Sequence, residues 1–119
     1  MARTSVTPQA VTLAGLAPTM TAPAGEGADN GDVVDFGRNL LIVTNSGSAA
    51  ISVTIETPET IDGDLSISDR VVSVAAGATV LIPLTSRHYQ QVSGDDQGRI
   101  YIDYGTGAAT DLTRAVVSL

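Results

Sequence analysis

The sequence predicts an all-β protein: an antiparallel β-sandwich, of jelly-roll or immunoglobulin-like type, with seven or eight short strands and an extended N-terminal arm. Three observations support this prediction. Val, Ile and Thr together make up 35 of the 119 residues, and such β-branched residues favour strands. Turn-forming residues interrupt the apolar runs about every 8–12 residues, the strand spacing of sandwiches and barrels. No stretch repeats its apolar residues with the period of a helix, so we expect little helix.

Size and composition narrow the possible functions. A chain of 119 residues is the size of one domain, and with one Phe, three Tyr and no Trp its core must be aliphatic. A net charge of −7 with six scattered Arg argues against direct binding of nucleic acid. The absence of Cys excludes disulfides and thiol nucleophiles. The longest aliphatic run, residues 40–43, is far below the ~20 residues of a membrane span, so we expect no membrane contact.

The first 32 residues differ in composition from the rest. They are rich in Ala, Thr, Pro and Gly, and only residues 10–16 could form an extended segment. We therefore divide the chain into an extended arm, residues 1–32, and a β-sandwich body, residues 33–119. Ordering an arm costs ~1–2 kcal/mol per residue, so it must gain contacts elsewhere, for example by strand addition to a neighbouring subunit.

The first strands of the body follow the arm. Residues 39–45 (NLLIVTN) are apolar on both faces, as in a central strand. After a turn at residues 45–48, residues 49–57 alternate apolar and polar side chains, as in a strand with one buried face. We expect these two strands to form a hairpin.

Further strands are expected at residues 65–68, 70–74 and 79–84. Pro83 removes one backbone donor, so the last of these should lie at a sheet edge or end there. Residues 99–104 (RIYIDY) alternate clearly, and residues 112–119 form a final run. Two antiparallel sheets packed face to face bury these strands most simply.

No motif in the chain predicts catalysis or a cofactor. His88 is the single His and has no neighbouring nucleophile or second ligand in sequence, and no G-x-S-x-G motif occurs. The carboxylates of Asp62, Asp64 and Asp69 could supply oxygen ligands to a calcium ion. Their run lacks the acidic twelfth position of an EF-hand loop, so we favour a turn over a calcium site. The glycines of residues 105–107 are expected to connect a hairpin, since too few residues follow for a dinucleotide-binding unit. We expect no enzyme activity, cofactor or metal.

The three tyrosines allow two interpretations. Tyr89, Tyr101 and Tyr104 could form a platform that stacks on sugar rings. The favoured alternative is that they close the ends of the aliphatic core with their hydroxyl groups in solvent.

Several segments together resemble a known group of proteins. These are the opening MARTSVTP, the Pro/Ala-rich arm, GRNLLIVTNSGSAAISVTIETP, VVSVAAGATVLIPLTSRHY and GRIYIDY. In style and order they resemble the small all-β virion proteins of tailed bacteriophages, and among these the head decoration proteins most.

This resemblance implies a structural role without catalysis. The protein would sit on the outside of the capsid after synthesis in the host bacterial cytoplasm, bind the major capsid protein, bridge capsomers and stabilise the shell. Self-association as a trimer is also implied. The acidic charge suits the capsid exterior. The alternatives are a head–tail connector or tail component, and a β-sandwich module that binds carbohydrate or the host surface.

Two segments are candidates for protein contacts. The arm and the polar segment after Pro83 are where we expect binding to the shell or to sister subunits. The candidate interface residues are Thr7, Pro8, Val11, Leu13, Leu16, Arg87, His88 and Tyr89.

Overall fold

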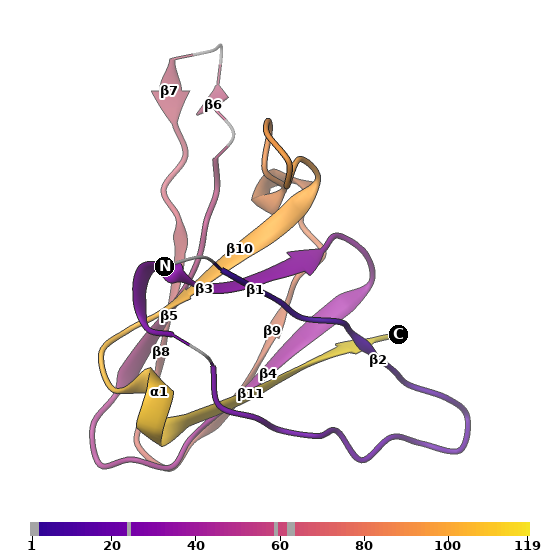
Figure 1. Cartoon of the computed structure of the whole chain (residues 1–119), viewed down its shortest axis with the longest axis vertical. Coiled ribbons are helices and arrows are strands. Elements are labelled where there is room, and N and C mark those ends of the chain that lie inside the picture. Colours follow the sequence, from indigo (N-terminus) through magenta and orange to yellow (C-terminus); the bar gives the residue numbers. More distant parts are fainter. Residues whose placement is uncertain (1–2, 24, 59, 62–63) are drawn as a thin grey trace.

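The computed structural model describes residues 3–23, 25–58, 60–61 and 64–119, and it is a β-sandwich of two sheets (Figure 1). Sheet A contains, in spatial order, β1 (Thr4–Ser5), β3 (Gly27–Asp35), β10 (Arg99–Tyr104), β5 (Ile51–Ile55) and β8 (Arg70–Val74). Sheet B contains, in the same way, β2 (Gln9–Ala10), β11 (Leu112–Ser118), β4 (Asn39–Asn45) and β9 (Thr79–Pro83). The prediction of a two-layered β protein is confirmed.

Little of the described chain is helical, as expected. A 3-10 turn, η1 (Arg87–Tyr89), follows β9, and one helical turn, α1 (Ala108–Asp111), precedes β11. Neither has the length or the apolar character to cross a membrane. A small hairpin of β6 (Thr60–Ile61) and β7 (Leu65–Ser66) projects from one end of the sandwich (Figure 1).

The sheets are mixed, so the prediction of a purely antiparallel sandwich is wrong. β1 pairs in parallel with β3, and β2 pairs in parallel with β11. All other strand pairs among the described residues are antiparallel. The cause is the N-terminal segment, which passes from sheet A to sheet B and runs in the same direction as β3 and β11, the strands that it joins.

Two connections that we expected to be hairpins instead cross between the sheets. β4 lies in sheet B and β5 in sheet A, while β10 lies in sheet A and β11 in sheet B. The first crossing is held by Asn45, whose amide donates to Ala49 O (2.8 Å) and Val74 O (3.0 Å). The second is held by Glu26, whose carboxylate accepts from the backbone N–H groups of Gly107 and Ala109. These side-chain bonds satisfy backbone groups that a hairpin ladder would otherwise pair.

The strands expected at residues 39–45, 49–57, 70–74, 79–84, 99–104 and 112–119 are present with small changes in their bounds. Other expectations are wrong: residues 65–68 form a strand only at Leu65–Ser66, the arm segment 10–16 is a strand only at Ala10, and the described residues form eleven strands where seven or eight were expected. β4 is central in sheet B, between β11 and β9, and alternates buried with half-buried residues. Pro83 is the last residue of β9, an edge strand, as predicted. The core is aliphatic and Tyr104 is its single fully buried aromatic residue; its buried members include Val34, Leu41, Val43, Ile55, Ile100, Ile102, Leu112 and Val116.

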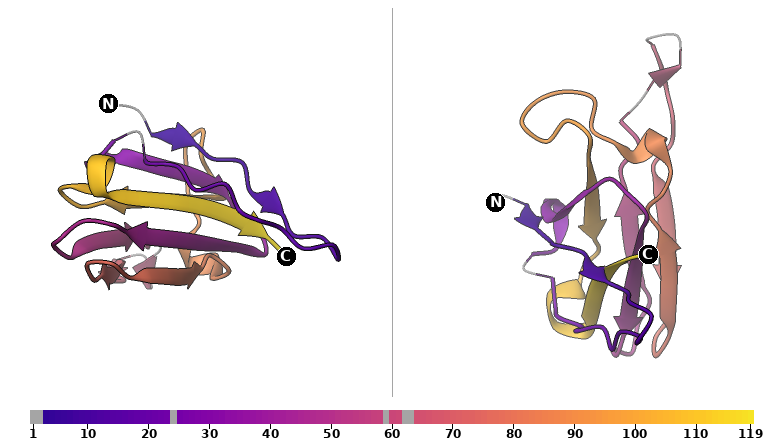
Figure 2. Two further views of the ribbon diagram at one scale, coloured as in Figure 1. Left: turned by 90° about the horizontal axis from the view of Figure 1, so that it is seen from below. Right: turned by 90° about the vertical axis from the view of Figure 1, so that its right-hand side faces the viewer.

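The expected boundary between arm and body, at residues 32 and 33, falls inside β3, which already begins at Gly27. Before β3, the described part of the arm lies along the side of the sandwich, and Val6 packs against the core. Between β2 and β3 it forms a loop that projects at the end of the molecule opposite the β6–β7 hairpin (Figure 2).

Candidate contact surfaces

The described residues contain no group of three His, Asp or Glu side chains that could hold a metal ion. His88 is exposed on η1. Asp69 accepts the backbone N–H of Thr57 (2.8 Å), so its carboxylate joins the two segments that lead into and out of the β6–β7 hairpin and does not stabilise a tight turn. Asp62 lies outside the described residues. The outer faces of the two sheets differ in character and are the candidate functional features.

The outer face of sheet B is uncharged. Leu41 and Val43 of β4 point into the core, so their neighbours along the strand point outward. The strand registers align these with outward residues of β11 and β9, and the hydroxyl groups of Thr44 and Thr79 lie 2.9 Å apart, on the same side. This face, which we call the uncharged face, consists of Thr113, Ala115, Val117, Leu40, Ile42, Thr44, Thr79, Leu81 and Pro83.

Part of the uncharged face is open to solvent. Leu81 is 57% exposed, Pro83 and Thr79 are exposed, and Leu40 and Ile42 are half-buried. None of the thirteen Asp and Glu residues of the chain lies in a strand of sheet B. An antiparallel sheet with one solvated face ordinarily alternates apolar with polar residues. An uncharged outer face of this kind is typical of a surface that contacts another protein.

The outer face of sheet A has the opposite character. Arg99 of β10 donates to Asp35 (2.8 Å) and Asp96 (3.3 Å), and Asp96 also accepts the Tyr101 hydroxyl (2.6 Å). That hydrogen bond raises the pKa of Tyr101 and lowers the pKa of Asp96. Arg3 also lies on this face. The sandwich thus has one charged face and one uncharged face.

Arg3 fastens the N-terminal segment across sheet A. Its guanidinium forms ion pairs with Glu56 and Asp103 and lies 4.1 Å from the centre of the Tyr101 ring. Burial raises the pKa of Glu56, the hydrogen bond with Asp103 raises it further, and the positive charge of Arg3 opposes both. Without that charge, two partly buried carboxylates would face each other.

We expect Arg3→Met to lower the free energy of unfolding by about 2 kcal/mol at pH 7, because Glu56 and Asp103 lose their shared cation. The loss should shrink as the pH falls into the range where Glu56, whose pKa is raised, becomes protonated, because a neutral Glu56 no longer repels Asp103. Urea denaturation at several pH values measures this. Arg38→Met is the control, since Arg38 is exposed and forms no ion pair with the described residues. Equal losses in both variants would contradict the role of Arg3.

A buried ion pair joins the two sheets. Arg114 of β11 donates from Nε and Nη2 to the two carboxylate oxygens of Asp32 in β3, at 2.7 and 3.0 Å. The Tyr104 hydroxyl donates to the same carboxylate (2.6 Å), and Thr21 of the arm accepts from Arg114 through its hydroxyl and its carbonyl. Burial, and then the charge of Asp32, raises the pKa of Tyr104 well above its ordinary value, so the hydroxyl remains a donor. Tyr104 therefore belongs to the interior.

This placement bears on the sugar platform considered above. Tyr104 is 1% exposed and Tyr101 is covered on one face by Arg3, so the three rings do not form one stacking surface. The expectation that the tyrosine hydroxyl groups reach solvent is also wrong for Tyr104, because burying an uncharged donor requires a partner and Asp32 supplies it.

The candidate interface residues of the arm lie at the edges of both sheets. Thr7 and Pro8 connect β1 and β2, and Val11, Leu13 and Leu16 lie in the projecting loop after β2. Leu13 is fully exposed and Val11 is 41% exposed. The side of the sandwich that they occupy is opposite β8 and β9.

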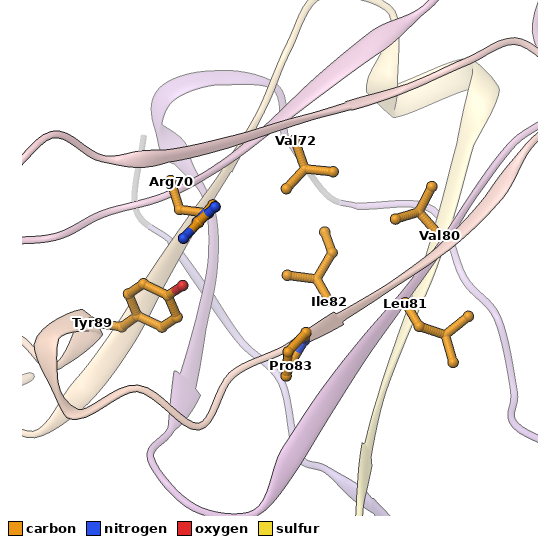
Figure 3. Close-up of a pocket in the computed structure, with 7 residues that line it drawn as sticks. All are labelled: Arg70, Val72, Val80, Leu81, Ile82, Pro83 and Tyr89. Atoms are coloured by element: carbon orange, nitrogen blue, oxygen red, sulfur yellow. The ribbon is translucent and has the colours of Figure 1, made fainter.

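The second candidate group, Arg87, His88 and Tyr89, forms η1 on the other side. Tyr89 lines a hollow of about 340 Å³ between β8 and β9, whose other lining includes Val72, Val80 and Ile82 (Figure 3). A second hollow of about 440 Å³, beneath the β6–β7 hairpin, shares Tyr89 and Arg70 with the first. The structure therefore does not bring the two candidate groups together, and their role in binding stays a prediction.

Sequence reasoning did not identify the uncharged face. Its signal in the sequence is the absence of any charged residue from positions 39–55 and 71–86. The register of β4 with β9 was needed to show that these two runs share one surface. Comparison of the chain with family models, curated proteins and solved structures finds no match.

Proposed function

We propose that the chain is a structural virion protein that binds the outside of a bacteriophage capsid and bridges capsomers. The observation that carries this proposal is the contrast between the two outer faces of the sandwich. The uncharged face can be desolvated against a protein shell at little electrostatic cost, while burying the charged face of sheet A would be costly. The protein would attach through sheet B and turn sheet A towards solvent.

The shape of the molecule also supports a bridging role. The β6–β7 hairpin projects at the top of Figure 1 and the loop between β2 and β3 projects at its lower right, so the two are well separated on a molecule of 40 × 36 × 23 Å. Each carries a strongly exposed apolar side chain, Leu65 in the hairpin (59% exposed) and Leu13 in the loop. Two separated contact points of this kind suit a protein that touches two neighbouring capsomers.

Several parts of this proposal come from the resemblance to head decoration proteins. They are the location on the virion, the major capsid protein as partner, the lack of catalysis, and the jelly-roll or immunoglobulin-like type of the sandwich. The resemblance also implies self-association as a trimer, which is the alternative to the two-fold contact inferred below. The net charge of −7 agrees with a position away from packaged DNA.

The experiment uses heads of the phage that encodes the chain, prepared from a mutant lacking this gene. We expect the purified protein to co-sediment with these heads and to saturate at a fixed number of copies per capsid. Absence of binding to the heads would contradict the proposal. Binding only to isolated tails, or assembly into rings without heads, would favour a tail or connector component.

A matched pair of variants tests which face attaches. Thr44 and Thr54 are both half-buried and both point outward, from β4 of sheet B and β5 of sheet A. We expect Thr44→Lys to weaken binding to heads by about tenfold or more, because it places a charge in the uncharged face. Thr54→Lys should bind like the wild type, because it adds a cation opposite Asp103 on the charged face. Equal binding by both variants would exclude the uncharged face as the site of attachment.

A further inference from the structure

The edge of sheet B formed by β9 is free to pair with another strand. Leu84 N donates to Asn39 O and Ala78 O accepts from Asn45 N, so the even-numbered residues from 78 to 84 direct their backbone groups towards β4. The backbone groups of Thr79, Leu81 and Pro83 therefore point away from the sheet. No strand in the described part of the chain pairs with them.

Pro83 is placed where its missing N–H costs the sheet nothing. Its nitrogen lies on the outward side of β9, so the pairing with β4 is intact. The remaining outward groups are the N–H and C=O of Thr79 and Leu81 and the C=O of Pro83. The side chains of β9 also alternate, between the two faces of the sheet: Val80 and Ile82 point towards Val72 of β8, and Leu81 points to the outer face (Figure 3).

The distribution of charge determines where two copies of the chain can meet. At a net charge of −7, copies repel each other wherever their carboxylates approach. The strands of sheet B contain no acidic residue, and residues 71–86, which include β9, contain no charge at all. The other free edge, β8, is less suitable, since Asp69 and Arg70 stand at its start and it borders the charged face.

We propose that β9 pairs antiparallel with β9 of a second copy, about a two-fold axis at Leu81. Leu81 then lies opposite Leu81 of the second copy, and the two residues exchange both backbone hydrogen bonds. In this register Thr79 N–H of each copy donates to Pro83 C=O of the other copy. The strand is self-complementary in this register. Each copy lacks only one of the hydrogen bonds that the pairing would allow, the one that would need an N–H on Pro83.

This contact joins two four-stranded sheets into one continuous sheet. Because the two-fold axis is perpendicular to the sheet, both uncharged faces point in the same direction, and so do both charged faces. The dimer thus doubles the uncharged face without burying any carboxylate. The inference rests on β9 and on the charge distribution, and it holds whether or not the protein binds a capsid.

Sedimentation equilibrium of the purified chain tests the proposal. One pair of five-residue strands buries less surface than a standard interface, so we expect a weak dimer that forms as the concentration rises. The mass should approach twice 12.1 kDa. A mass that stays at one chain up to about 1 mM, or a mass of three chains as in the trimer implied by the resemblance, would overturn the two-fold contact.

Leu81→Glu and Val71→Glu form a matched pair for the same measurement. The two side chains are 57% and 59% exposed, and both point outward from edge strands, β9 and β8. Leu81→Glu places two carboxylates next to each other on the axis, so we expect dimerisation to weaken by about tenfold or more. Val71→Glu should dimerise like the wild type. Equal behaviour of the two variants, each confirmed as folded by circular dichroism, would overturn the proposal.

The absence of cysteine from the chain permits a direct test of the register. Residues opposite each other in a hydrogen-bonded antiparallel pair have Cα atoms about 5.5 Å apart, within the range of a disulfide. We expect Leu81→Cys to form a disulfide-linked dimer under mild oxidation, and Ile42→Cys, at the centre of the uncharged face, to form none. Cross-linking of Ile42→Cys in place of Leu81→Cys would show face-to-face packing and overturn the edge pairing.

Discussion

Removing Arg114 is expected to destabilise the protein by about 3–5 kcal/mol, because Arg114→Met leaves the carboxylate of Asp32 buried without its cation. Asp32 has no exposed surface, and its carboxylate accepts two hydrogen bonds from Arg114 and one from Tyr104. Asp32→Asn should cost a similar amount, since it leaves the guanidinium without a charge partner. Urea denaturation followed by circular dichroism measures both losses.

Two controls separate the ion pair from its surroundings. Tyr104→Phe removes one neutral donor and should cost only about 1–2 kcal/mol. Replacing both charged residues, as Asp32→Leu with Arg114→Met, should recover much of the loss of the single variants, because no uncompensated charge remains in the interior. A loss below about 1 kcal/mol in Arg114→Met would show that water or other groups replace the guanidinium.

Gly31→Ala is expected to destabilise the protein by roughly 3 kcal/mol or more. A Cβ atom at Gly31 would lie 1.9 Å from Ile102 O and 2.9 Å from its carbonyl carbon, so the backbone of β10 would have to move. Gly31 lies where the register between β3 and β10 shifts. The adjacent residue, Asp32, forms the buried ion pair, so a displacement of β3 would disturb that interaction too.

Gly37→Ala is the matched control for this position. The nearest atom to a Cβ there is Asn39 Nδ2 at 3.6 Å, which is ordinary contact. We expect a change within about 0.5 kcal/mol. Thermal or urea denaturation of the two variants, compared with the wild type, measures the difference. Similar stabilities for the two variants would contradict the close approach of β3 and β10.

The functional proposals depend on the same division of the molecule. The ion pair of Asp32 with Arg114 and the clamp of Arg3 hold the two sheets and the N-terminal segment together. The charged side chains on the outer face of sheet A pair with one another, while sheet B keeps an uncharged face and a free edge. Variants of Arg114 or Gly31 should therefore reduce stability, while variants of Thr44 or Leu81 should reduce binding and leave stability nearly unchanged.

Local sequence patterns determined most of the strands. Alternation of apolar and polar residues identified β5 and β10, and an apolar run on both faces identified β4. Pro83 identified an edge, because a residue without an N–H is excluded from the interior of a sheet. These features depend on side chains a few positions apart, so they can be read from the chain itself. The sequence also determined the aliphatic core and the absence of cysteine chemistry.

Only the tertiary structure decided which strands share a sheet. A short connection that crosses between sheets looks like a hairpin in sequence, and the side chains of Asn45 and Glu26 make the difference through contacts with distant backbone groups. Arg114 reads as an isolated charge in an apolar run until Asp32, 82 positions away, neutralises it. The uncharged face likewise exists only because register aligns β4, β9 and β11. Pairing between distant segments is set by packing across the whole domain, which local patterns do not encode.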